Sequence, residues 1–483
     1  MRIIICYDND IVKNEMVQDI IGTKTFAEVV IGRRRVEETV LGLLQTCFPG
    51  AIIKRIDAAT QYETVEEQLK PFVGEDVRVL HLFSNWFITD EKKALLSFQK
   101  LNYIDSPWKM CADKQLVGMM FPDVKTYLPF CKNRLAGVTS SDAVNYINQE
   151  FPIEGVSNLA QVSRLVACLT GNFEARYFNT LTETKYTLTK SSTDKDKLKK
   201  EYTFYHLLPD EMKPWFVLPY NYREDKDTAS YTMERLYMTD LAIKWVHGSI
   251  EPEEFETILD MYFHFFSVRS RRMCSAQVYQ KTADALYVDK VKERTIQLQA
   301  HPAYTKLSQF LEAGHVRLDE LVDAYFDLKK QMEKNLRAPN CQVIGHGDPG
   351  FANALYHKST RTLKFIDPKG ALTEEEMWTN PYYDLAKLSH CICGRYDFFN
   401  SGLFDIKLGE QLKFELDIPF DNAPYRALFQ QKVEQNGFDY VAVRVYEISL
   451  FLSLLPLHMD NPYKVFGFIL NIQNLLNEVK QYV

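Results

Sequence analysis

One short segment, residues 343–368, constrains the fold of this chain more than any other. An apolar run, Val343–Ile344, leads into a tight polar loop, and a second apolar run, Ala354–Tyr356, leaves it. A third apolar run, Leu363–Ile366, ends in Asp367 and a proline. Short apolar runs bounded by Gly and Pro are typical of strands. The segment therefore predicts short strands joined by a hairpin-like excursion, with polar side chains at the strand edges.

Three of those polar side chains are suited to one reaction. The hairpin geometry can bring Asp348, Asn353 and Asp367 together. Phosphoryl transfer needs a base or orienting group for the attacking hydroxyl, and hard oxygen ligands for Mg²⁺ on the triphosphate. Asp348 can accept the hydroxyl proton, and Asn353 and Asp367 can hold the metal. The spacing Asp-x-x-x-x-Asn is that of the kinase catalytic loop, so we predict ATP- and Mg²⁺-dependent phosphoryl transfer with Asp348 as the catalytic base.

The segments His346–Asn353 and Ile366–Pro368 resemble matching motifs of the aminoglycoside phosphotransferase and choline kinase superfamily. His-Gly-Asp stands where protein kinases have His-Arg-Asp, and Asp-Pro-Lys where they have Asp-Phe-Gly. The resemblance covers residues 156–483. It implies an α+β protein-kinase-like, bilobal domain with a small β-rich lobe and a large helical lobe. The alternative is a coincidence of two unrelated polar turns.

The resemblance also implies a strand lysine that holds the nucleotide phosphates and a helical glutamate that pairs with it. Tyr186–Lys190 alternates like a strand, and Glu201 follows on the next predicted helix, which begins after Asp194 and runs through Leu207. We predict that Lys190 and Glu201 form this ATP-binding pair. In the alternative, both are solvated residues of a charged stretch.

Further ATP contacts are predicted from position along the chain. The loop that covers the nucleotide should join the first two strands of the small lobe. Strand-like runs at 164–169 and 175–181 place Gly171 and Asn172 in it. The segment that frames adenine should follow the strand-like run 231–233, with Glu234 and Leu236 presenting backbone groups. An ordinary β-turn is the alternative for Gly171 and Asn172.

The acceptor side is less specific, with Tyr383, Tyr396 and Asp397 as candidate binding residues. Aromatic rings with a carboxylate can cage a quaternary ammonium, as in choline kinases. The same residues can stack on a sugar ring or belong to a helix core. The continuation from residue 366 looks closest to kinase-like proteins of bacterial surface-polysaccharide pathways, such as capsule biosynthesis. We therefore predict a kinase for a hydroxyl of a small-molecule acceptor: a sugar, a polyol or a choline-like compound.

The first 155 residues show a different pattern. Strand-like runs at 2–6, 51–56 and 77–83 alternate with helical stretches, which favours an α/β domain with a mainly parallel sheet. The stretch 22–30 and the helix after it are similar to sugar-nucleotidyltransferases, without their Gly-rich loop and metal-binding Asp. Two alternatives follow: a catalytically weak, nucleotide-binding kinase-like module fused to a ligand-binding domain, or a bifunctional transferase making an activated sugar.

Length and charge limit the other possibilities. A chain of 483 residues exceeds what one hydrophobic core usually holds, and we predict domains at 1–155, 156–237 and 238–483. The net charge of −7 argues against a dedicated nucleic-acid binder. The N-terminal sequence lacks the features of a signal peptide, and the apolar stretch 448–457 is about half of a membrane span. We expect a cytoplasmic protein without a transmembrane segment; the sequence does not indicate its oligomeric state.

Overall fold

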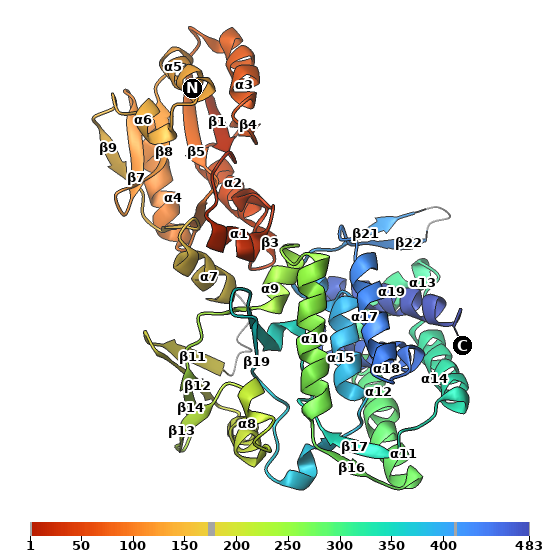
Figure 1. Cartoon of the computed structure of the whole chain (residues 1–483). Coiled ribbons are helices and arrows are strands. Elements are labelled where there is room, and N and C mark those ends of the chain that lie inside the picture. Colours follow the sequence, from red (N-terminus) through yellow and green to blue (C-terminus); the bar gives the residue numbers. More distant parts are fainter. Residues whose placement is uncertain (1, 172–178, 410–412, 483) are drawn as a thin grey trace. The chain divides into compact units, whose positions relative to one another are not determined.

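The computed structural model describes residues 2–171, 179–409 and 413–482, which divide into two compact units, Met1–Phe173 and Glu174–Val483 (Figure 1). The division lies after residue 173 rather than 155. The segment expected to form the first strand of the small lobe, 164–169, is part of helix α7 (Val162–Gly171). Leu165 and Leu169 lie about one helical turn apart and both are buried, so their spacing is helical. The predicted strand over 164–169 is therefore wrong.

The first unit is built on a six-stranded sheet with the order β4-β1-β5-β8-β7-β9. Strand β1 pairs in parallel with β4 and β5, and β7 pairs in parallel with β9. Strand β8 is antiparallel to both of its neighbours, so the sheet expected to be mainly parallel is mixed. The sheet strands are β1 (Arg2–Asp8), β4 (Ile52–Ile56), β5 (Val77–Phe83), β7 (Trp108–Ala112), β8 (Gln115–Phe121) and β9 (Glu150–Pro152).

Helices and two small antiparallel strand pairs complete this unit. Its helices are α1 (Glu15–Ile21), α2 (Val36–Cys47), α3 (Gln61–Leu69), α4 (Glu91–Lys100), α5 (Val124–Leu135), α6 (Ser140–Ala143) and α7, with short 3₁₀ turns η1 (Phe26–Glu28), η2 (Lys70–Phe72) and η3 (Leu101–Tyr103). The small pairs are β2 (Val30–Ile31) with β3 (Arg34–Arg35), and β6 (Trp86–Ile88) with β10 (Val156–Asn158). The carboxyl end of β1 carries the fully buried Asp8, whose carboxylate accepts a hydrogen bond from the Tyr62 hydroxyl at 2.6 Å. The similarity of this unit to nucleotidyltransferases stays a prediction.

The second unit begins with a four-stranded antiparallel sheet of order β11-β12-β14-β13. Its strands are β11 (Asn179–Glu183), β12 (Thr187–Ser192), β13 (Pro219–Glu224) and β14 (Ala229–Glu234). Helix α8 (Lys195–Leu207) follows β12 and packs on β13 and β14, which confirms the helix expected after Asp194 (Figure 1). Asp194 caps it by accepting from the Lys197 amide at 3.1 Å. A small core of Leu198, Tyr231 and Met233 joins helix and sheet.

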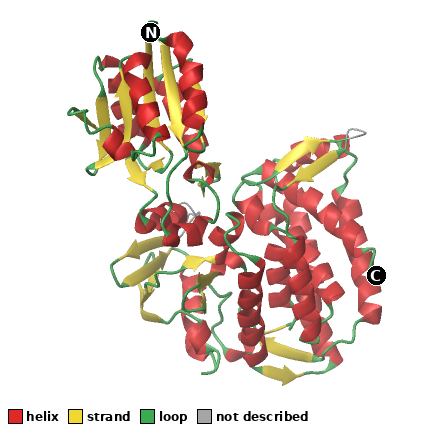
Figure 2. Ribbon diagram, turned by 45° about the horizontal axis from the view of Figure 1, so that its top comes forward, coloured by secondary structure: helices red, strands yellow, loops and turns green. Residues whose placement is uncertain are grey.

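The rest of this unit is mainly helical, with only short strands (Figure 2). Its helices are α9 (Leu241–Val246), α10 (Pro252–Val268), α11 (Ala276–Asp284), η5 (Ala285–Asp289, a π-helical turn), α12 (Lys290–Gln299), α13 (Tyr304–Ala313), α14 (Leu318–Asn335), α15 (Tyr383–Ile392), α16 (Tyr396–Asn400), α17 (Ala423–Gln435), α18 (Tyr440–Leu454) and α19 (Pro462–Val479). The 3₁₀ turns are η4 (Lys213–Trp215), η6 (Phe351–Asn353), η7 (Glu374–Met377) and η9 (Leu455–His458). The strands are β15 (Thr239–Asp240), β16 (Arg271–Met273), β17 (Cys341–Ile344), β18 (Ala354–His357), β19 (Thr362–Phe365), β20 (Trp378–Thr379), β21 (Asp405–Leu408) and β22 (Phe414–Asp417). One large apolar core extends through these helices.

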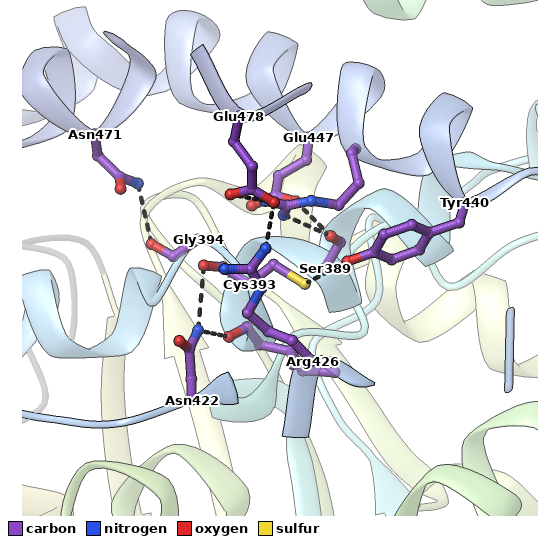
Figure 3. A network of polar contacts seen from close by, with 11 residues as sticks. Ser389, Cys393, Gly394, Asn422, Arg426, Tyr440, Glu447, Asn471 and Glu478 are labelled. Atoms are coloured by element: carbon purple, nitrogen blue, oxygen red, sulfur yellow. Dashed lines mark hydrogen bonds and ion pairs between the residues drawn. The ribbon is translucent and has the colours of Figure 1, made fainter. Parts of the chain in front are cut away.

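A buried polar network holds the C-terminal half of α15 against its neighbours (Figure 3). Arg444 of α18 forms ion pairs with Glu447 on the same helix and with Glu478 of α19, the latter at 3.2 Å. The Ser389 hydroxyl of α15 donates to Glu447. Asn471 of α19 donates to the Gly394 carbonyl just beyond α15 at 3.1 Å. These contacts fix the helix that carries part of the site described below.

Among the described residues, one helical stretch, Tyr440–His458, is long and apolar enough to cross a membrane by those two criteria. Most of it, 72%, is buried inside the molecule, and it includes Arg444 and Glu447 of the buried network. The stretch is therefore the central helix of the large core.

Candidate active site

The β18–β19 hairpin brings the three predicted catalytic-loop residues together. Strand pairing sets Ala354 opposite Phe365, so Asn353 and Asp367 leave the same end of the hairpin. The Ile366 amide donates to the Asn353 carbonyl at 3.0 Å. The Asn353 side-chain amide donates to the backbone carbonyl of Asp348 at 2.9 Å. The sequence spacing and the observed geometry therefore agree for this part of the site.

Lys190 links the four-stranded sheet of the second unit to the same cluster. Its ammonium lies 2.7 Å from a Glu201 carboxylate oxygen and 2.9 Å from an Asp367 oxygen. Lys190 and Glu201 are each 3% exposed. Burial disfavours the ammonium, but Asp367 and Glu201 outweigh it and raise the Lys190 pKa above its ordinary value. The Tyr231 hydroxyl, on the strand beside Lys190, donates to Glu201 at 3.1 Å. The expected alternative of solvated residues is excluded for both members of the pair.

A buried histidine shapes the loop around Asp348. His346 is 0% exposed, and burial lowers its pKa. Its Nδ1 accepts from the Asp348 amide at 3.1 Å, so Nε2 carries the proton and donates to the Ile366 carbonyl at 2.9 Å. A neutral imidazole in this tautomer connects the loop of Asp348 to the strand end that presents Asp367.

Asp384, at the start of α15, holds the other side of the loop. Its two carboxylate oxygens accept from the His346 and Gly347 amides, each at 2.9 Å. The Arg269 guanidinium lies 3.1 Å from the same carboxylate, and both side chains are buried. Asp384 thus holds the loop that precedes Asp348 through two backbone amides.

Two residues near the loop adopt left-handed backbone conformations. Gly347 has φ of +83°, and a Cβ there would come within 2.6 Å of the Lys369 Cβ. Asp367 has φ of +52°, which is uncommon for a residue with a side chain. Such conformations cost energy and cluster at functional sites. The Lys369 side chain lies against Gly347, directly beside Asp348.

The structure adds a residue that sequence reasoning missed, Lys387. Its ammonium lies 3.0 Å from Asp348 Oδ1, while the Asp348 side chain is 48% exposed. Burial lowers the Lys387 pKa, but Asp348 and Tyr383 outweigh it and hold the pKa above its ordinary value. Lys387 lies four residues after Tyr383, and this spacing on one helix face is the signal that could have found it.

The three predicted acceptor residues lie close to this loop. Tyr383 and Asp397 are buried, and Tyr396 is partly buried against His390, with ring centroids 4.3 Å apart. Burial raises the pKa of Asp397 to about 7 and that of Tyr396 to about 12. The negative charge of Asp348 adds to both pKa shifts. A role in acceptor binding stays a prediction for all three residues.

The remaining predicted nucleotide contacts have mixed outcomes. Gly171 ends helix α7, so the strand–turn–strand expected around it is wrong, and Asn172 lies outside the described residues. Glu234 ends β14, and the segment after it leads to the mainly helical part of the unit, while its contact with adenine stays a prediction. Glu234 and Leu236 line a cavity of about 290 Å³ together with Tyr205, Phe216 and Lys364. None of the catalytic-loop residues lines that cavity.

The donor set fits a magnesium ion bound with a nucleotide. Asp367 supplies a carboxylate, of which one oxygen faces Lys190, and Asn353 supplies an amide oxygen, because its nitrogen is used by the Asp348 carbonyl. Mg²⁺ prefers oxygen ligands and usually takes one or two protein side chains plus substrate phosphates. Among the described residues there is no cluster of three or more His, Cys, Asp or Glu side chains that would hold a metal without a nucleotide.

No protein-family model matches the sequence, and no curated protein matches it. Among solved structures, a spectinomycin phosphotransferase in complex with ADP and spectinomycin is similar at 11% identity and a TM-score of 0.35, covering 64% of this chain and 91% of its own. An aminoglycoside phosphotransferase is similar at 10% identity and a TM-score of 0.35, covering 66% and 99%. An ethanolamine kinase from Plasmodium vivax is similar at 10% identity and a TM-score of 0.32, covering 66% and 87%.

Proposed function

We propose that the second unit is a small-molecule kinase, which transfers the γ-phosphoryl group of ATP to a hydroxyl of its acceptor. The observation that carries this proposal is the Lys190 ammonium bridging Glu201 and Asp367 at 2.7 and 2.9 Å, next to the hydrogen-bonded pair Asn353 and Asp348. Kinases of this type require the lysine–glutamate pair and the metal-binding aspartate to be in place together.

Each residue has a distinct part in the proposed reaction. Asp348 accepts the proton of the attacking hydroxyl, and its half-exposed carboxylate can be reached by an acceptor. Lys190 holds the α- and β-phosphates, and Glu201 orients it. Asp367 and Asn353 would hold Mg²⁺, which when bound neutralises charge on the triphosphate. Lys387 lies beside Asp348 and can stabilise negative charge on the transferred group.

The acceptor, the pathway and the role of the first unit were also predicted from the sequence. A sugar, polyol or choline-like acceptor and a surface-polysaccharide pathway stay predictions. The nucleotidyltransferase-like unit stays a candidate ligand-binding domain. The alternative, a catalytically weak nucleotide-binding module, also predicts that the protein binds ATP. It differs from the proposal because it predicts little or no ADP release with any acceptor.

The test compares wild type, Asp348→Asn and the control Asp323→Asn, an exposed residue of α14. Calorimetry with ATP analogue and Mg²⁺ should show binding to all three proteins with Kd values within about threefold. ADP release with a panel of sugars, polyols, choline and aminoglycosides should fall by about 10²–10⁴-fold in Asp348→Asn only, the usual contribution of a catalytic base. Absence of nucleotide binding to wild type, or full turnover by Asp348→Asn, would contradict the proposal.

A further inference from the structure

Three lysines lie around Tyr383 and the neighbouring proposed catalytic base, Asp348. The Lys290 ammonium lies 3.3 Å from the Tyr383 hydroxyl and 5.8 Å from its ring centroid. Lys387 lies on the same face of α15 and pairs with Asp348 at 3.0 Å. The Lys369 side chain lies over Gly347, in the same loop as Asp348.

The charges of this group do not cancel. Asp348 neutralises one ammonium, that of Lys387. Throughout the described residues, no carboxylate lies within 4.0 Å of the ammonium of Lys290 or of Lys369, so two positive charges have no ion-pair partner. The field is strong enough to act on Tyr383: burial would raise its pKa, but Lys387 and Lys290 hold it below its ordinary value. The surroundings of Asp348 therefore favour a ligand that brings negative charge.

The position of Lys290 is built into the fold by an irregular helix. Lys290 is the first residue after the π-helical turn η5 between α11 and α12. The Tyr287 carbonyl in that turn accepts from the Tyr325 hydroxyl at 2.8 Å, and the Tyr287 ring stacks on Tyr446 at 3.8 Å. π-helical turns change the register of a helix and are frequent at functional sites. A rigid turn of this kind presents Lys290 to Tyr383 at low entropic cost.

The same geometry argues against a cationic acceptor. A quaternary ammonium would be caged by the faces of aromatic rings, and Lys290 already lies within cation–π distance of Tyr383. A choline-like group or an aminoglycoside would meet like charge there. A neutral sugar would leave the ammonium groups of Lys290 and Lys369 without a carboxylate or phosphate as an ion-pair partner.

We propose that the acceptor of this kinase carries an anionic group, a phosphate or a carboxylate, which Lys290, Lys369 and the Tyr383 hydroxyl bind while Asp348 faces the hydroxyl to be phosphorylated. This inference rests on the proposed function and specifies its substrate class. Lys290 lies outside the predicted nucleotide contacts, so its substitution separates acceptor binding from ATP binding.

The test first fills the nucleotide site with the non-hydrolysable analogue AMP-PNP and Mg²⁺, and then measures the binding of inorganic phosphate by calorimetry. Wild type should bind phosphate, Lys290→Met should bind it about 10-fold more weakly, and Lys290→Arg should retain most of the affinity. The control Lys292→Met, an exposed lysine of the same helix, should bind like wild type. The Kd of AMP-PNP should stay within about twofold in all variants.

A turnover assay distinguishes an acceptor that carries a phosphate from one that carries a carboxylate. ADP release is compared for glucose, glucose 6-phosphate, glucuronate and glucosamine, and for glycerol, glycerol 3-phosphate, glycerate and choline. At least one anionic compound should bind or react more strongly than its neutral and cationic counterparts, and Lys290→Met should raise its KM about 10-fold without changing the KM for ATP.

These measurements distinguish a failure of the kinase proposal from a failure of the anionic-pocket proposal. If AMP-PNP does not bind, the proposed function is overturned. If AMP-PNP binds but phosphate does not, or if Lys290→Met and Lys292→Met bind phosphate equally, the anionic pocket is overturned and the kinase proposal stands. Preference for a neutral or cationic acceptor would also overturn the pocket.

Discussion

At the scale of single residues, the site depends on buried polar groups whose neighbours set their protonation. His346 is held neutral, Lys190 is held charged between two carboxylates, and Asp397 is buried near Asp348. A carboxyl group in an apolar site keeps its proton to higher pH, because charging it there costs desolvation energy. Asp397 is accordingly a group whose protonation links folding stability to pH between about 4 and 7.

For Asp397→Asn we predict a change in the pH dependence of stability. The wild-type carboxyl has a folded pKa of about 7 against 3.8 when unperturbed, so between these values the folded state binds more protons than the unfolded state. Stability from this group is present below about pH 4 and declines as the pH rises toward 7, by at most about 1.4 kcal/mol per pH unit. Urea unfolding from pH 4 to 8 should show this slope in wild type and its loss in the variant. Parallel curves for the two proteins would contradict the prediction.

At the scale of elements, helix α15 is held at both ends by polar contacts. Asp384 at its start fixes the catalytic loop and Arg269, and Ser389 near its end joins the network of Arg444 and Glu447. Tyr383 and Lys387 lie between these anchors, so the helix reaches the site as a rigid element. Loss of the network should therefore lower the free energy of unfolding and alter the geometry around Asp348.

Arg444→Met should destabilise the protein by about 3–5 kcal/mol, because it leaves the buried Glu447 without its cation. The double variant Arg444→Met with Glu447→Leu should recover part of that loss, since it removes the unpaired charge as well. Urea unfolding curves measure both changes. A single variant within about 1 kcal/mol of wild type would show that the ion pair contributes little. The exposed pair of Arg317 and Asp319 offers a control, for which Arg317→Met should cost less than about 1 kcal/mol.

At the scale of the whole molecule, the chain has two compact units, and the large core of the second draws only on residues 204–479. The residues proposed for nucleotide binding, for catalysis and for acceptor binding all belong to that second unit. A ligand that binds the folded form of one unit stabilises that unit by mass action.

Calorimetric unfolding should show two transitions, and AMP-PNP with Mg²⁺ should raise the midpoint of one of them. At about 100 times its Kd, the ligand should add about 2.7 kcal/mol to that unit. Val79→Ala, at a fully buried position of the first unit, should lower only the other midpoint, and Ile448→Ala, buried in the second, should lower the ligand-sensitive one. A single unfolding transition whose midpoint shifts with the ligand and with both variants would contradict the prediction that the two units unfold independently.

The sequence by itself determined what depends on short stretches of chain. The Asp348–Asn353 spacing, the hairpin that follows it, and the strand and helix that carry Lys190 and Glu201 are local patterns, and their geometry follows from turns and periodicity. The α/β nature of the first unit and the helical character after residue 239 were predictable for the same reason.

Only the tertiary structure decided contacts between distant segments. Lys190 meets Asp367 across 177 residues, Arg269 meets Asp384 across 115, and Lys290 meets Tyr383 across 93. No local pattern encodes such pairs, because they depend on how helices and strands pack. Packing also made 164–169 a helix although its apolar run looked like a strand. The proposed anionic acceptor site depends on these long-range contacts, since the positive charge around Tyr383 comes from three separate segments.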